Sequence, residues 1–599
     1  MLLIALSFSA IRFANPPNNN ISYDYYGSYL YLPALFIYDD IGIRNFEVID
    51  SLNSIYNNTP MFYQFSAGSD GQLVIRFFAG MSYMFLPGFF TGHIIALLTD
   101  YPADGFSLPY QRALLVSGMI ISLLGLFFAR KILLRFFDDV TTALSLFFLF
   151  VGSNLIFFYT YGNDAPHLYL FTLYTIFIWL TIRWHDKPGT GKAALMGLVT
   201  GLIIVSRPSE MISLIIPLAW GVYNWRTFRQ KVVLLVQNYH HLLIALLIII
   251  LTVLPQIIYW KVVTGSFFFS PYDDPSSTLK LSDPQFTSVL FGFRKGWFIY
   301  APMMIFTVVG LLMMFRKYPG YALPLLIFVV LNTYLIASFT SLISFGWRAF
   351  IQSYAMLILP MGVFINFVIT RKKILRAILL LILILLTLLH LFKTYQLVIG
   401  VIDGSRMTKE YFFATFFSRQ ASPEDKKLLL IERPHSDVEV LENEEDYNYQ
   451  LLKTLDFEIP LKGRDAFYDT IIVYKGLHSL RMDNTNPYSD GYATTFNELT
   501  DNYYAWIRAS AWVFAPDTVS MKQLRLVVQF DNEGKIYKYR STLLSDEKFA
   551  AQAGKWSKIQ IDYLTPEVVS KDDRLKVYLW YEGKEPVYVD NLKIELFDR

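Results

Sequence analysis

The sequence contains no cysteine among its 599 residues, which excludes disulfide bonds, thiol nucleophiles and cysteine-ligated metal sites. Charged residues are also scarce, at 17% of the chain against ~25% in typical soluble proteins. Apolar residues make up 54%, and the mean hydropathy is +0.37. A soluble fold cannot bury so much apolar surface, because its exposed surface grows too steeply with mass. The composition therefore excludes a wholly soluble protein, a disordered chain and a disulfide scaffold.

Motifs that would indicate energy coupling are also missing. No GxxxxGK[ST] phosphate-binding loop occurs, so the chain has no P-loop ATPase site. Neither HExxH nor another metal-ligand spacing occurs. The apolar runs contain few acidic residues, whereas an ion-coupled transporter usually places carboxylates inside its spans. These absences argue against an ATP-driven or ion-coupled transporter.

The small net charge of +3 conceals two parts of opposite charge. Residues 1–420 carry 29 Lys and Arg against 18 Asp and Glu, whereas residues 421–599 carry 23 against 31. The long apolar runs lie in the first part. We therefore expect a membrane domain followed by a water-soluble domain.

Apolar runs in the first part are long enough to be membrane spans, since a helix needs ~20 residues to cross the bilayer. We expect about eleven crossings, the first of them uncleaved. They lie near 1–14, 110–129, 140–159, 166–182, 192–206, 211–224, 241–260, 298–315, 320–338, 350–370 and 375–395. A further apolar stretch, 77–98, is interrupted by Pro87 and Gly88, and we expect it to lie along the membrane surface.

Basic residues in five short loops indicate the orientation. All five loops lie on one side if every expected span crosses, and the positive-inside rule makes that side cytoplasmic. These residues are Arg130, Lys131, Arg135, Arg183, Lys187, Lys192, Arg226, Arg229, Lys231, Arg316, Lys317, Arg371, Lys372, Lys373 and Arg376. We therefore expect a multi-pass protein of the cytoplasmic (inner) membrane, with the first long loop and everything after 396 on the periplasmic side.

Two acids in the expected outer loops are candidate catalytic residues. Asp24 follows the first span among Tyr23, Tyr25 and Tyr26, and partial burial among such rings would favour a role as a base. The alternative is a solvated acid within an interfacial aromatic belt. Asp164 lies in the second outer loop, where it can also cap the helix that follows.

Four cations on the same expected side run against the positive-inside bias. They are Arg207, Arg294, Lys295 and Arg348. A bound anion such as a lipid phosphate would explain them, because Arg presents a rigid fork of donors to phosphate oxygens. The alternatives are contact with lipid headgroups or pairing with an acid, such as Glu210 for Arg207.

The second part changes to a period of two, which is typical of half-buried strands. The alternating apolar residues include Leu524, Leu526, Val528 and Phe530, then Leu575, Val577 and Leu579, then Leu592, Ile594 and Leu596. Several such strands at short spacing predict a β-sandwich, specifically a jelly roll. Trp512, Trp580 and Tyr588 are either sugar-stacking residues or part of the core. We expect three regions: membrane domain 1–395, connector 396–464 and sandwich 465–599.

The order of features in residues 1–420 matches a known pattern. A first span is followed by a long loop with an early Asp, an interfacial helix, a second acidic loop and further spans, and the segments FRKGWFIYAP (293–302), SFGWRAF (344–350) and MTKEYF (407–412) have counterparts. The chain thereby resembles the GT-C glycosyltransferases, in particular the bacterial dolichyl-phosphate-mannose-protein mannosyltransferase-like group. The region from about 465, with Gly554-Lys555-Trp556 and Tyr588 to Asn591, looks like a carbohydrate-binding jelly roll.

This resemblance implies a fold and an activity. The fold is a polytopic α-helical membrane protein followed by an all-β sandwich. The activity is transfer of a sugar, with inversion, from a polyprenyl-phosphate donor to a glycan, lipid or protein acceptor. Asp24 would deprotonate the acceptor and Asp164 would be the second-loop acid, although Tyr25 stands where many relatives have another acid beside the first. A divalent metal stays open, and neither another cofactor nor a nucleic-acid partner is expected.

Two other classes of protein remain as alternatives. A lipid or polysaccharide transporter would explain the spans, but not the long acidic first loop or the sugar-binding-like region after it. A non-catalytic sugar-binding membrane protein would tolerate loss of Asp24.

Overall fold

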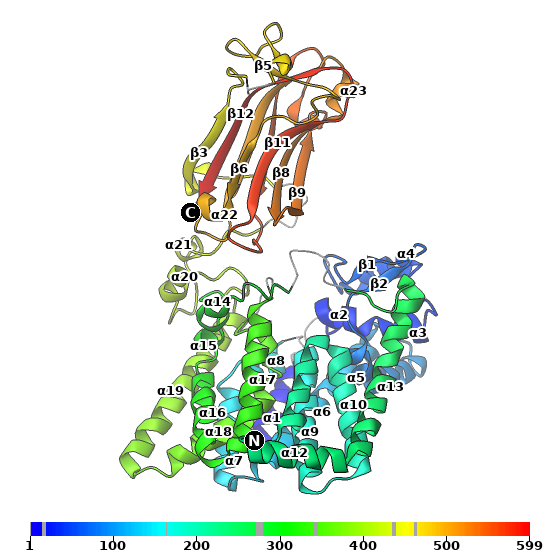
Figure 1. Ribbon diagram of the computed structural model, residues 1–599, viewed down its shortest axis with the longest axis vertical. Helices are drawn as coiled ribbons and strands as arrows, with labels where there is room; N and C mark the ends of the chain where they lie inside the picture. The colour runs from blue at the N-terminus through cyan, green and yellow to red at the C-terminus, as the bar shows by residue number, and fades with distance from the viewer. Residues whose placement is uncertain are drawn as a thin grey trace. The chain divides into compact units, whose positions relative to one another are not determined.

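The computed structural model describes residues 2–14, 19–162, 165–270, 279–339, 345–433, 439–460 and 464–599. The chain divides into two compact units. The helical unit comprises residues 1–271 and 284–422, and the β unit comprises 272–283 and 423–599. Figure 1 shows helices throughout the first unit and strands throughout the second.

Helices make up most of the described part of the helical unit. The longer ones are α1 (Leu2–Ala14), α4 (Phe46–Tyr56), α5 (Gly80–Leu97), α6 (Leu108–Leu133), α7 (Asp139–Val151), α9 (Ala165–Asp186), α10 (Thr190–Ser206), α12 (Trp225–Gln237), α13 (Tyr239–Thr264), α16 (Met303–Lys317), α17 (Pro319–Ala337), α18 (Tyr354–Ile369) and α19 (Lys373–Val398). The shorter ones are α2 (Tyr23–Tyr29), α3 (Tyr31–Phe36), α8 (Leu155–Thr160), α11 (Ile215–Ala219), α14 (Phe286–Phe291), α15 (Trp297–Tyr300), α20 (Lys409–Ala414) and the 3₁₀ helices η1 (Pro208–Leu214) and η3 (Arg348–Phe350). One small hairpin, β1 (Phe65–Ala67) with β2 (Leu73–Ile75), lies in the first long loop.

Five helices in the described part of the chain are long and apolar enough to cross a membrane: α5, α6, α13, α17 and α19. Four further apolar segments are shorter, at 10–17 residues. The apolar, helical character expected of the first part is therefore confirmed. The expected number of crossings, about eleven, stays a prediction.

Three of the expected spans are not single helices. Residues 140–159 divide into α7 and α8 at Gly152, next to Ser153, whose hydroxyl donates to the Leu149 carbonyl and so competes with the helical backbone pattern. Residues 298–315 divide into α15 and α16 at Pro302, which has no backbone N–H to donate. Residues 211–224 form only the end of η1 and the five-residue α11, which contains Pro217.

The 77–98 stretch forms α5, which continues through Pro87 as one helix. The short helices α2 and α3 contact both of its flanks, because Tyr31 donates to the Phe77 carbonyl at 2.6 Å and Tyr29 to the Gly105 carbonyl at 2.5 Å. The Tyr29 ring also lies 6.4 Å from that of Phe85, near the middle of α5. The helix thus runs alongside the first long loop. Its position in a membrane stays a prediction, since its length and composition would also allow it to cross.

The β unit contains two antiparallel sheets around one apolar core (Figure 1). The six-stranded sheet has the order β10-β7-β12-β5-β4, with β3 also paired to β12, and the four-stranded sheet has the order β6-β11-β8-β9. The bounds are β3 (Asn448–Leu455), β4 (Tyr468–Asp469), β5 (Ser479–Met482), β6 (Tyr492–Thr495), β7 (Trp506–Phe514), β8 (Leu524–Asn532), β9 (Lys535–Leu543), β10 (Trp556–Leu564), β11 (Arg574–Tyr581) and β12 (Val587–Asp598).

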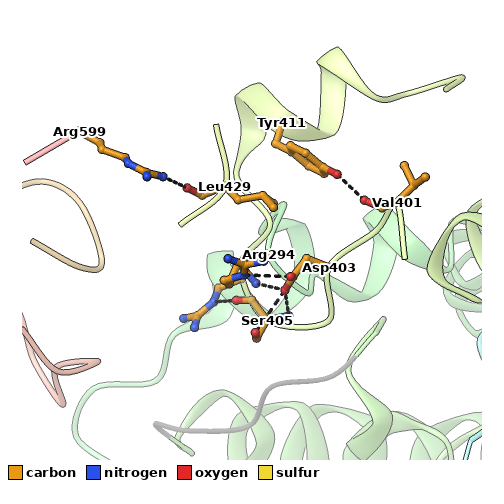
Figure 2. Close-up of polar contacts among 8 residues, drawn as sticks. Arg294, Val401, Asp403, Ser405, Tyr411, Leu429 and Arg599 are labelled. Atoms are coloured by element: carbon orange, nitrogen blue, oxygen red, sulfur yellow. Dashed lines mark hydrogen bonds and ion pairs between the residues drawn. The ribbon is translucent and has the colours of Figure 1, made fainter. Parts of the chain in front are cut away.

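The alternation seen in the sequence is confirmed for β8, β11 and β12. All the apolar residues named for these three strands are at most 2% exposed and belong to the shared core. Because β3 pairs with β12, the sandwich begins upstream of the expected boundary at 465. A segment before β3 also contacts the end of β12, because the Arg599 guanidinium donates to the Leu429 carbonyl at 3.0 Å (Figure 2). The jelly-roll topology stays a prediction.

Candidate functional site

The structure brings Asp24 and Arg348 into direct contact, although 324 positions separate them. Nη2 of Arg348 donates to Oδ2 of Asp24 at 2.8 Å, and the hydroxyl of Tyr63 donates to Oδ1 at 2.8 Å. Burial and the neighbouring carboxylate raise the pKa of Tyr63, so its hydroxyl stays protonated and remains a donor. Both partners of the ion pair are about a quarter exposed, at 24% and 28%. An ion pair so accessible to water contributes at most about 1 kcal/mol to stability, which favours a functional reason for it.

The residue before each member of this pair has a strained backbone. Tyr23 and Trp347 both have φ of +51°, in the left-handed region that aromatic residues rarely adopt. The Tyr23 backbone is held there because its N–H donates to the Asn58 carbonyl at 3.0 Å. Strain of this kind concentrates at functional sites, where the surrounding fold holds a side chain in a required direction.

Buried side chains hold the segment that carries Arg348. The side-chain amide of Asn154 donates to the carbonyls of Phe345 and Gly346, at 3.1 and 2.9 Å. The hydroxyl of Tyr354 donates to the Asn154 oxygen at 2.5 Å and accepts from the Trp297 indole at 2.9 Å. Gly346 suits this segment because its φ is +59°. The break between α7 and α8 therefore positions Asn154 where its side chain can hold the segment that carries Arg348.

Arg294 and Lys295 are engaged with other groups. Nε of Arg294 donates to the Ser405 carbonyl at 2.5 Å, in the turn that Asp403 organises (Figure 2). The Lys295 ammonium lies 4.6 Å from the centre of the Trp347 ring, as a cation–π contact. Lys295 thus touches the residue next to Arg348, whereas Arg294 anchors the segment after α19. Their predicted binding of a phosphate stays a prediction.

Arg207 lies beside a buried acid. Its Nε is 4.0 Å from Oε1 of Glu210, the pairing weighed from the sequence, and Glu210 is only 2% exposed. The Glu210 carboxylate also accepts from the Tyr174 hydroxyl at 2.5 Å and from the Gln352 amide at 3.0 Å. The oxygen of Gln352 in turn lies 2.9 Å from Nδ1 of His167.

Four polar residues of this region were not singled out in the sequence: Tyr63, His167, Tyr174 and Gln352. Their positions gave only weak signals, namely a tyrosine in the long first loop and polar residues at the ends of apolar runs. Glu210 was considered only as a partner of Arg207. Asp164 lies outside the described residues. Among the residues that the structure does describe, no three His, Asp or Glu side chains gather as a metal site.

The three aromatic residues named from the sequence lie in two places in the β unit. On the six-stranded sheet, Trp512 stacks on Tyr474 at 4.0 Å, and Tyr588 is buried at 9% exposure. On the outer face of the four-stranded sheet, Trp580 stacks on Tyr488 at 6.3 Å, and Tyr488 is 51% exposed. Of the three aromatics named from the sequence, Trp580 therefore lies in the more accessible group.

Comparisons with known proteins do not identify a family. No protein-family model and no curated protein matches the chain. Similar solved structures include the CBM22-1 and CBM22-2 xylan-binding domains of Xyn10C from Paenibacillus barcinonensis. The first is 18% identical with a TM-score of 0.19 and covers 26% of this chain and 98% of that domain. The second is 17% identical with a TM-score of 0.17 and covers 24% and 98%. At these scores the likeness does not identify a ligand.

Proposed function

We propose that the chain is a GT-C-type membrane glycosyltransferase, which moves a sugar from a polyprenyl-phosphate donor to an envelope glycan, lipid or protein. The observation that carries this proposal is the Asp24–Arg348 pair, with Tyr63 on the same carboxylate. It joins a proton acceptor to a phosphate-binding cation at one point, and transfer from a sugar phosphate needs both. A transporter requires neither group to be reactive.

The proposed reaction proceeds with inversion at the sugar. An acceptor hydroxyl attacks the anomeric carbon, the bond from that carbon to the phosphate oxygen breaks, and the electron pair leaves with the phosphate. The hydroxyl proton passes to Asp24, while Arg348 stabilises the charge on the leaving phosphate. A guanidinium has five N–H donors in a rigid fork, so it can contact a phosphate and a carboxylate together.

The ion pair also suggests an order of events. Both oxygens of Asp24 are engaged, because Oδ2 accepts from Arg348 and Oδ1 accepts from Tyr63. A donor phosphate that takes over part of the Arg348 guanidinium frees Oδ2 to receive the acceptor hydroxyl. Catalytic competence of Asp24 would then depend on the presence of the donor.

The other candidate residues have supporting places in this proposal. Arg207, Arg294 and Lys295 contribute positive charge for the phosphate, and Arg294 also holds the segment after α19 through its bond to the Ser405 carbonyl. Asp164 acts as the second-loop acid. If the chain crosses the inner membrane about eleven times, as the sequence predicts, the site faces the periplasm, where a flipped donor would present its sugar.

Deletion of the gene tests the proposed activity. Mass analysis of envelope glycans and glycolipids should reveal a product that lacks one sugar, and the wild-type chain should restore it while Asp24→Asn should not. An unchanged set of glycans and glycolipids would contradict the proposal. A transporter would instead leave an undecorated precursor on the cytoplasmic side, whether or not Asp24 is replaced.

We propose a second function for the β unit, the binding of a glycan on the outer face of the four-stranded sheet. Tyr488 and Trp580 stack there, Tyr578 lies edge-on to Tyr488 at 5.9 Å, and the Arg525 guanidinium lies 5.4 Å from the Trp580 ring. Exposed rings beside polar groups can stack on a sugar ring while its hydroxyls are hydrogen-bonded.

The full-length chain, titrated with oligosaccharides prepared from the cell envelope, tests this second function. Tyr488→Ala should weaken binding about tenfold, roughly the loss of 1.4 kcal/mol. Tyr503→Ala is the matched control, since Tyr503 is 43% exposed but is not part of this group. The second function would be contradicted if the wild type bound no oligosaccharide, or if the two variants lost affinity equally. The four-stranded sheet would then have a structural role alone.

A further inference from the structure

A chain of buried hydrogen bonds leads from Glu210 to His167. Glu210 accepts from the amide nitrogen of Gln352, and the oxygen of Gln352 lies 2.9 Å from Nδ1 of His167. Glu210, Gln352 and His167 are 2%, 1% and 7% exposed. The hydrogen bonds that join these three side chains are therefore shielded from water.

This arrangement determines where the His167 ring carries its proton. Both oxygens of Glu210 accept hydrogen bonds, from the Tyr174 hydroxyl and from the Gln352 amide nitrogen, so the oxygen of Gln352 faces His167. The amide oxygen of Gln352 carries no hydrogen and only accepts, so Nδ1 of His167 must carry the hydrogen. A neutral imidazole with Nδ1–H has an acceptor lone pair at Nε2. No described residue of the chain is a hydrogen-bond partner of that atom.

The His167 ring also lies within the electrostatic reach of the candidate site. The charges of Arg207, Arg348 and Asp24 all act on it. A sugar attached to a phosphate on Arg348 would present its hydroxyls in this neighbourhood.

We infer that Nε2 of His167 accepts a hydrogen bond from one hydroxyl of the donor sugar and so helps to select the sugar that is transferred. This inference rests on the proposed function. Glu210 and Gln352 are positioning residues, because their hydrogen bonds hold His167 in the tautomer with the hydrogen on Nδ1. A site built to pair with a substrate hydroxyl discriminates strongly against the analogue that lacks it, since its own polar group is then left unpaired.

Two variants separate this role from a structural one. In His167→Asn the side-chain nitrogen replaces Nδ1 and keeps the donor to Gln352, but nothing replaces Nε2. In Gln352→Leu the ring remains, but the group that fixes its tautomer is lost. Both are compared with the wild type by thermal unfolding and by kcat/KM for decaprenyl-phosphate glucose, galactose, mannose and their monodeoxy analogues.

The wild type should discriminate about tenfold or more against one monodeoxy donor, and His167→Asn should abolish that discrimination while it lowers kcat/KM for the parent sugar. Gln352→Leu should reduce the discrimination severalfold. If discrimination is unchanged in either folded variant, or all donors lose activity equally, the inference is overturned while the proposed function stands. If the wild type transfers no sugar from any donor, the proposed function fails and this inference fails with it.

Discussion

At the scale of the residue, the Asp24 carboxylate receives donors from two distant parts of the chain, Tyr63 in the first loop and Arg348 in η3. The residues that precede Asp24 and Arg348, namely Tyr23 and Trp347, both have a strained backbone. The fold thus sustains an unfavourable conformation at two places to create one contact that adds little to stability. This combination is typical of a site maintained for chemistry.

Arg348→Lys should lower sugar transfer at least tenfold although the positive charge is kept. Lysine offers a point charge on a flexible stem in place of the planar fork, so it cannot hold Asp24 and a phosphate in a fixed geometry. Turnover of the polyprenyl-phosphate sugar by purified protein measures the effect. Arg371→Lys is the matched control, because Arg371 lies in an expected cytoplasmic loop and contacts the Phe367 ring at 4.1 Å. Equal activities of the two variants would remove Arg348 from phosphate binding.

Residue types alone were enough to select Asp24 and Arg348 from the sequence, because an acid among aromatics and a cation on the outer side are both unusual. The sequence did not predict that they touch, since nothing local encodes a contact over 324 positions. Tyr63, Gln352 and His167 were missed for the same reason. Each is an ordinary polar residue until the tertiary fold gives it a partner.

At the scale of the element, the two-residue period correctly predicted which strand residues face the core. The length of an apolar run was a poor guide to whether it forms a single helix. The two-residue period of β8, β11 and β12 is local, and the structure confirms which side chains point inward. The division of 140–159 into α7 and α8 depends on Ser153 and on the use of Asn154 to hold a distant segment. An apolar run shows that a segment avoids water, but not whether it forms a single helix.

Helix α5 depends on a close approach at its first residue. A Cβ atom on Gly80 would lie 2.4 Å from the backbone nitrogen of Ser206, at the end of α10. Gly80→Ala should therefore destabilise the protein by about 1–3 kcal/mol, as overpacking does. Thermal unfolding in detergent measures the change.

Gly191→Ala is the control for this prediction, because Gly191 lies in α10 with open space around it. Alanine has the higher helix propensity, so this change should be neutral or stabilise by up to about 1 kcal/mol. A Gly80→Ala protein as stable as the Gly191→Ala protein would show that α5 does not pack as described.

At the scale of the whole molecule, the opposite charges of the two parts of the sequence correspond to two compact units of different architecture. The charge change near residue 420 predicted this division, since the β unit resumes at Pro423. The expected sandwich boundary at 465 was too late, because β3 has little local signal before it pairs with β12.

The absence of cysteine makes the membrane topology directly testable. Single cysteines placed at the exposed positions Ser51 and Lys571 should react with a membrane-impermeant maleimide in spheroplasts. A cysteine at the exposed position Lys372 should react only after lysis, because the positive-inside rule places it in the cytoplasm. Labelling of Ser51→Cys and Lys372→Cys from the same side would contradict the proposed topology.

The most direct test of the central claim is the turnover of a radiolabelled polyprenyl-phosphate sugar by purified wild-type and Asp24→Asn proteins. Asparagine keeps the size of the side chain but cannot take a proton, so transfer should fall by about 10²–10⁴-fold while the protein stays folded and still binds the donor. Near-normal turnover by Asp24→Asn would contradict the account, because Asp24 would then not be the base.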